Sequence, residues 1–194
     1  LLGERLLEFP LKSPLVLEPL LAESMPSVSK DGKTYTIKLK KGVLWQDDAA
    51  FKDGKGRELV AEDFIYAWKR LLHPELQSPG SWIFEDKVVG YSQLKNKITS
   101  DKSKTADQWI AETIPGFAAL DNYTIQIKLE APYPQLLYVL QMGFAAPVAK
   151  EVVEKYGQVA IGEHVVGTGP YVVREIVHGS KIVLERSPSF RKET

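Results

Sequence analysis

The chain has 194 residues, 44% hydrophobic and 26% charged, so it is long enough to bury a core in one or two globular domains. Its 25 basic and 25 acidic residues give a formal net charge of zero, which provides neither a basic surplus for nucleic acid nor an acidic tail. Cysteine is absent, which excludes disulfides, thiol catalysis and cysteine metal sites.

The sequence shows no export signal and no uninterrupted membrane-spanning stretch. The first residue is Leu1, and no basic segment followed by an apolar stretch comes after it, so we expect that any export signal was removed before this numbering begins. The longest uncharged run, Ala131–Ala149, is interrupted by Pro132, Pro134 and Pro147. A membrane-spanning helix needs about 20 predominantly apolar residues, so we expect no span here.

The first clear element is a strand. Apolar and polar residues alternate from Thr34 to Lys40, which predicts a half-buried strand. A polar loop, Gln46–Glu58, follows and contains several acidic residues. These acids suggest calcium, but the ligand spacing of an EF-hand is missing, so a solvated turn is the favoured interpretation.

A helix is predicted over Ala61–Leu72, where apolar residues recur at steps of three and four. Acidic residues occupy its first turn and basic residues its last turn, which suits the helix dipole. Val60 offers no side-chain acceptor at the cap position, and His73-Pro74 ends the helix.

The second half of the chain contains further short elements. The pattern predicts an exposed loop over Asn96–Thr105, and Thr105 with Gln108 predicts a capped short helix over Ala106–Thr113. A hairpin is expected from Ile114–Leu120 and Tyr123–Leu129. Two helices are expected after it, Pro134–Gln141 and Ala149–Tyr156. A last hairpin, Val172–Val177 with Lys181–Arg186, turns at Gly179 and needs a larger sheet to cover its apolar surface.

Catalytic and phosphate motifs are weak in this sequence. His73, His164 and His178 are scattered without the spacing of a metal or catalytic pair, and no Gly-x-Ser-x-Gly motif occurs. The Gly167-Thr168-Gly169 segment superficially suggests a phosphate loop. It leads into a strand, however, whereas phosphate loops lead into a helix, so we reject that interpretation.

The four tryptophans divide by context. Trp45, Trp68 and Trp109 lie in apolar or helical patterns and are expected in the core. Trp82 follows a Pro-Gly-Ser loop, where an aromatic residue can line a ligand site, although packing beneath the loop is the more common outcome.

Two segments carry a family resemblance. Val166–Tyr171, with the sequence Val-Gly-Thr-Gly-Pro-Tyr, and Ile182–Phe190 resemble the extracytoplasmic oligopeptide- and dipeptide-binding proteins of ABC importers, a family with nickel-binding relatives. Supporting matches occur in the family's order at Leu20–Ser24, Asp31–Ile37, Ala61–Phe64, Ala131–Pro134 and Ala145–Gly157.

The resemblance implies an α+β fold: a mainly antiparallel sheet with flanking short helices, forming a partial lobe of a type II periplasmic-binding-protein fold. Residues 1–146 are expected to form an accessory α+β subdomain of the first lobe. Residues 147–194 are expected to return partly into the main first lobe, the rest of which, with the second lobe, is expected outside this chain.

The resemblance also points to a ligand-binding stretch, Pro79, Gly80, Ser81 and Trp82. In several oligopeptide binders a tyrosine follows the Ser-Pro step and faces the peptide. Here Gly80 occupies that position, so ligand contact by Trp82 is a hypothesis. The Gln46–Glu58 loop is longer than in typical members.

The implied function is that of the solute-binding component of an ABC importer, which captures peptides outside the cytoplasmic membrane and delivers them to the permease. We expect a monomer at the periplasm or cell surface, without cofactor, metal, catalytic residues or nucleic-acid partner. A non-transport sensor or interaction module with the same fold is the alternative. A hydrolase is disfavoured because no nucleophile–base pair is evident.

Overall fold

The computed structural model describes residues 3–159, 164–177 and 179–191, in which the chain forms two compact units. The sheet unit comprises Arg5–Lys40 and Val60–Pro147, and the hairpin unit comprises Leu1–Glu4, Lys41–Leu59 and Val148–Thr194. The sequence predicts one break near residue 146, whereas the structure also groups Lys41–Leu59 with the C-terminal segment. The assignment of these units to the lobes of a binding protein stays a prediction.

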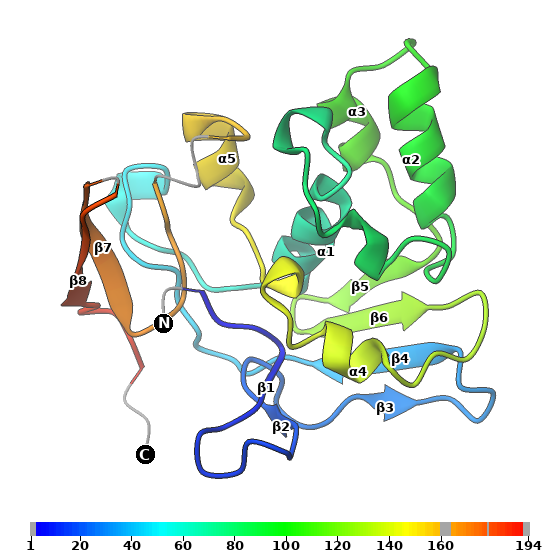
Figure 1. The fold of residues 1–194 in the computed structure, drawn as a ribbon, viewed down its shortest axis with the longest axis horizontal. Helices are drawn as coiled ribbons and strands as arrows, with labels where there is room; N and C mark the ends of the chain where they lie inside the picture. Colours follow the sequence, from blue (N-terminus) through cyan, green and yellow to red (C-terminus); the bar gives the residue numbers. More distant parts are fainter. Residues whose placement is uncertain (1–2, 160–163, 178, 192–194) are drawn as a thin grey trace. The chain divides into compact units, whose positions relative to one another are not determined.

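A four-stranded antiparallel sheet is the base of the sheet unit (Figure 1). Its strand order is β3 (Ser27–Val28), β4 (Thr34–Lys38), β6 (Thr124–Lys128) and β5 (Phe117–Asp121). In the register of β4 with β6, Tyr35 lies opposite Ile127 and Ile37 opposite Ile125. All four side chains are buried, so the alternation expected at residues 34–40 is confirmed.

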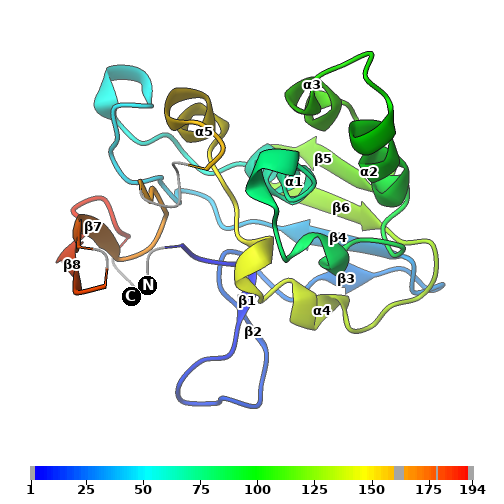
Figure 2. The same cartoon turned by 45° about the horizontal axis from the view of Figure 1, so that its top comes forward.

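Helices cover one face of this sheet, as Figures 1 and 2 show from two directions. They are α1 (Ala61–Arg70), α2 (Tyr91–Ser100) and α3 (Ala106–Ala111). The remaining elements of the unit are shorter: β1 (Leu7–Glu8) paired with β2 (Glu18–Pro19), α4 (Leu136–Val139), and three single turns, η2 (Pro74–Leu76), η3 (Ser81–Ile83) and η4 (Gly143–Ala145).

The core between helices and sheet is built around Trp68. Its ring lies 5.2 Å from the Phe84 ring and 5.0 Å from the Phe117 ring, centroid to centroid, in tilted arrangements that aromatic pairs favour. Its indole N–H donates to the Ala145 carbonyl at 3.0 Å, and its own carbonyl accepts from the Tyr91 hydroxyl at 2.9 Å. The expected core positions of Trp45, Trp68 and Trp109 are confirmed.

Helix α1 begins without a side-chain acceptor at its cap residue, Val60, as the sequence predicts. Asp63 supplies the other half of a capping arrangement, because its carboxylate accepts from the Val60 N–H at 3.0 Å. The helix start is thereby stabilised from inside its first turn.

The expectation of an exposed loop over Asn96–Thr105 is wrong for residues 96–100, because α2 extends to Ser100, and is confirmed for residues 101–105. Tyr91, Leu94 and Ile98 are buried and form a narrow stripe on one side of this helix. The exposed lysines and hydroxyl residues of the opposite side obscure that stripe in the sequence.

The hairpin unit contains η1 (Lys52–Gly54), α5 (Lys150–Tyr156) and an antiparallel pair, β7 (Tyr171–Val177) and β8 (Lys181–Arg186). Gly179 has a φ of 71°, as expected of the turn residue, while the neighbouring His178 lies outside the described residues. Arg57 holds α5 to the loop before α1 through a bidentate ion pair with Glu151, at 2.6 and 2.8 Å.

Gly56 marks a close approach of two backbone segments in the same unit. A Cβ atom there would lie 1.9 Å from the Trp45 carbonyl oxygen, so a larger residue would force the segments apart. Across the part of the chain that the structure describes, no helix has the length and apolar character needed to cross a membrane.

Candidate functional site

The stretch predicted to bind ligand, Pro79–Trp82, runs into the single turn η3 in the sheet unit. Gly80 is buried, and its N–H donates to the Ser78 hydroxyl at 3.1 Å. Trp82 is exposed, with 49% of its surface accessible, and Pro79 is exposed as well. The structure therefore presents a large aromatic side chain on a loop whose backbone is held in place.

Lys87 accompanies the exposed Trp82 side chain. Its ammonium group lies 6.0 Å from the centre of the Trp82 ring and 5.6 Å from that of Tyr133, and it donates to the Trp82 carbonyl at 3.1 Å. A cation over aromatic faces attracts their negative quadrupole, which restricts the rings. Tyr133 lies far from Trp82 in sequence, and Lys87 belongs to no recognisable motif. The sequence alone therefore does not indicate this group of three side chains.

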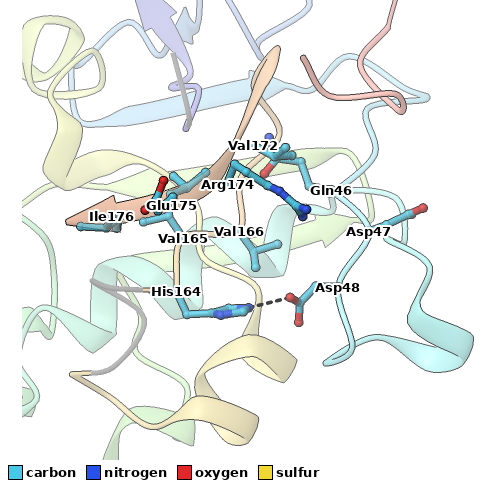
Figure 3. A pocket seen from close by; sticks show the side chains of 11 residues that line it. Gln46, Asp47, Asp48, His164, Val165, Val166, Val172, Arg174, Glu175 and Ile176 are labelled. Atoms are coloured by element: carbon cyan, nitrogen blue, oxygen red, sulfur yellow. Dashed lines mark hydrogen bonds and ion pairs between the residues drawn. The ribbon is translucent and has the colours of Figure 1, made fainter. Parts of the chain in front are cut away.

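A second candidate site is a cavity of 430 Å³ in the hairpin unit (Figure 3). Residues of three segments line it: Gln46–Asp48, His164–Val166 and part of β7 from Val172 to Ile176. Its charged residues have partners, since Asp47 pairs with Lys55 at 2.6 Å and Glu175 with Lys181 at 2.8 Å. The cavity is therefore polar but internally neutralised.

Asp48 ties the walls of this cavity together. Its carboxylate lies 2.6 Å from the His164 Nε2 atom, drawn as a dashed line in Figure 3, and accepts from the Ala50 N–H at 2.7 Å and the Tyr156 hydroxyl at 3.0 Å. Burial opposes ionisation of Asp48, but these hydrogen bonds outweigh it and hold the pKa of this carboxyl below its ordinary value. The Tyr156 ring also stacks on His164, with 3.9 Å between centroids.

The Gln46 side chain fixes the path of the glycine-rich segment Gly167–Gly169 through hydrogen bonds to its backbone. Its side-chain amide donates to the carbonyls of Gly169 at 3.0 Å and Tyr171 at 2.7 Å, while its carbonyl accepts from the Gly167 N–H at 3.2 Å. The segment held by these bonds is followed directly by β7, which begins at Tyr171. The expectation that Gly167–Gly169 leads into a strand is confirmed. The Gly167 N–H that a phosphate would need is already occupied.

The histidines described by the structure serve local packing. His73 is buried, and its Nδ1 accepts from the Glu75 N–H at 3.2 Å, which caps η2. A histidine–carboxylate pair such as His164–Asp48 can orient an imidazole for proton transfer. Among the described residues that line this cavity, none is a serine, threonine or cysteine that such a pair could activate. Among the described residues, no group of three or more potential ligands is placed to hold a metal ion.

Comparison with known proteins gives the decisive observation. The profile described as "Bacterial extracellular solute-binding proteins, family 5 Middle" matches residues 16–194. The chain belongs to this family of bacterial extracellular solute-binding proteins.

Several curated relatives are described as peptide-binding proteins. The chain is 30% identical over 174 residues to the periplasmic oligopeptide-binding protein OppA of Escherichia coli, an alignment covering 89% of this chain and 28% of OppA. It is 32% identical over 185 residues to a dipeptide-binding protein of the same organism, covering 93% of this chain and 31% of the relative.

Solved members of the family share the fold. OppA of Haemophilus influenzae, in complex with the peptide RPPGFSPFR, superposes with a TM-score of 0.74 at 27% identity, covering 97% of this chain and 33% of that protein. OppA of Burkholderia pseudomallei gives the same TM-score at 26% identity. The expected α+β class, a partial lobe of a type II periplasmic-binding-protein fold, is confirmed. The chain spans about a third or less of the length of these relatives.

Proposed function

We propose that the complete protein captures peptides outside the cytoplasmic membrane and delivers them to an ABC permease. The observation that carries this proposal is the family match over residues 16–194, together with relatives described as oligopeptide- and dipeptide-binding proteins. Peptide backbone groups would pair with strand edges, and roomy wet pockets would accept varied side chains. Closure of the two lobes around the peptide would signal the permease.

We place Pro79–Trp82 at the ligand. Support comes from the 49% exposure of Trp82 on a backbone fixed by Ser78, because an aromatic side chain held in place offers contact area at a small entropic cost. The protein would act as a monomer and would bind rather than transform its ligand.

A mass-spectrometric inventory of molecules that co-purify with the complete protein tests the ligand class. Peptides should be recovered. Deoxycholate is a suitable non-peptide probe, since one relative is described as a probable deoxycholate-binding periplasmic protein. Recovery of non-peptide solutes alone, with no peptide bound on titration, would overturn the proposal.

The role of Trp82 is tested separately by Trp82→Ala in the complete protein. We expect peptide affinity to fall about tenfold, as for loss of one well-placed aromatic contact, while Trp82→Phe retains most of it. Unchanged affinity in Trp82→Ala would remove Trp82 from the site and leave the ligand class untouched.

A further inference from the structure

Gly80 and Phe144 occupy the same space above the proposed ligand loop. A Cβ atom built on Gly80 would lie 2.5 Å from two ring atoms of Phe144 and 2.9 Å from its Cβ. Real Cβ atoms essentially never approach so closely, so the Phe144 ring fills the position that a side chain at residue 80 would take. The loop at Gly80 and the turn η4 are therefore in direct contact, although Gly80 and Phe144 lie 64 positions apart in sequence.

Phe144 stands on a rigid base. The next residue, Ala145, is fully buried, its carbonyl accepts from the Trp68 indole at 3.0 Å, and its N–H donates to the Met142 carbonyl at 2.9 Å. The turn η4, the short yellow coil that follows α4 in Figures 1 and 2, is thus anchored in the aromatic core of the sheet unit. A side chain on such a base keeps its orientation.

The Phe144 ring is nevertheless accessible, with 38% of its surface exposed, and Trp82 two residues beyond Gly80 is 49% exposed. Two large exposed aromatic side chains on segments that contact each other at Gly80 offer apolar area whose burial is favourable. A ring of this kind, held in place before binding, favours a partner with an apolar side chain, because neither group loses much conformational freedom.

We propose that Phe144 contacts the ligand and, together with Trp82, selects peptides that carry an aromatic or large apolar side chain. This inference rests on the proposed peptide-binding function and names the substrate class of that site. Gly80 is then required not for backbone freedom but because its missing Cβ leaves room for the Phe144 ring.

The test uses the complete protein and five synthetic peptides: tetra-alanine and its four variants with one phenylalanine. The native protein should bind at least one phenylalanine variant about tenfold more tightly than tetra-alanine. Phe144→Ala should abolish that difference by weakening the phenylalanine variant much more than tetra-alanine, and Phe144→Tyr, which keeps the ring, should restore it. Tyr138→Ala, which removes another exposed aromatic of the same unit, should alter neither affinity.

Gly80→Ala provides a second route, because it displaces the ring without deleting it and should reduce the phenylalanine preference in the same direction. Equal loss of affinity for all five peptides in Phe144→Ala, or an unchanged preference, would overturn the inference and leave the proposed function standing. Failure of the native protein to bind any of the five would instead overturn the proposed function, and the inference with it.

Discussion

In the hairpin unit, one buried polar side chain holds a distant backbone segment in place through hydrogen bonds. Gln46 is 4% exposed and satisfies three backbone groups of the segment from Gly167 to Tyr171. Nothing in the residues near Gln46 indicates this role, because its partners are more than a hundred positions away. A buried polar side chain of this kind is costly to remove, since its partners remain buried without hydrogen bonds.

Replacement of Gln46 by leucine should therefore destabilise the hairpin unit by about 2–5 kcal/mol, as expected when several buried backbone groups lose their partners. The measurement is hydrogen–deuterium exchange of residues 165–171 in the complete protein, which should become faster. Gln93→Leu makes the same change on an exposed position of α2 and should have no such effect. Unchanged exchange in Gln46→Leu would contradict the assigned role.

Asp48 makes the stability of the hairpin unit depend on pH. Because the folded state holds the pKa of this carboxyl below its ordinary value, its contribution is fully present above the unfolded pKa and is lost as the pH falls through the folded pKa. Asp48→Asn should therefore lower stability by about 1.5–3 kcal/mol at neutral pH, as for charge-assisted hydrogen bonds, with the difference from native shrinking below about pH 4.

Urea midpoints of the native and Asp48→Asn proteins between pH 3 and pH 7 measure this difference. The exposed Asp53 lies in the same loop, and Asp53→Asn is the matched control that should track the native protein. A native-minus-mutant difference that stays constant over the whole pH range would show that the carboxylate charge at Asp48 does not matter.

At the scale of elements, helix α1 shows where a favourable interaction is still missing. Val60 supplies no side-chain acceptor to the first turn, although Asp63 already bonds back to the Val60 N–H. Val60→Thr should complete the reciprocal arrangement and raise stability by about 0.5–1 kcal/mol. Thermal melting of the complete protein checks this, with Val89→Thr as a control outside the cap position. A lower melting temperature in Val60→Thr would contradict it.

Local elements could be predicted from the sequence because their signals are short in range. The alternation at Thr34–Lys38, the capping residues Thr105 and Gln108, and the turn at Gly179 each specify structure within a few residues. Helix α2 is not predicted from the sequence because its buried stripe contains only three residues, which are surrounded by polar neighbours. Strand order could not be predicted, since β4 lies beside β6 through pairings that only the folded chain reveals.

The candidate site divides in the same way. The stretch Pro79–Trp82 could be named from loop composition and family resemblance, and the structure shows Trp82 exposed there. The position of Phe144 over Gly80 could not be anticipated, because it depends on how η4 packs against the core through Ala145. Side chains that meet through tertiary packing leave no spacing pattern in the sequence.

At the scale of the whole molecule, the proposed function makes this chain one part of a longer peptide-capturing protein. The solved relatives are about three times as long as this chain, which covers 33% of Haemophilus influenzae OppA. Peptide binding by two closing lobes needs contacts from both, so the chain alone should fold without gripping a ligand.

Calorimetric titration of tetra-alanine and its phenylalanine variants into the complete protein, beside the same titration into the 194-residue chain, tests this claim most directly. The account predicts saturable binding, micromolar or tighter, to the complete protein and no saturable heat with the chain alone. Equal affinity in both, or no peptide binding in either, would contradict it.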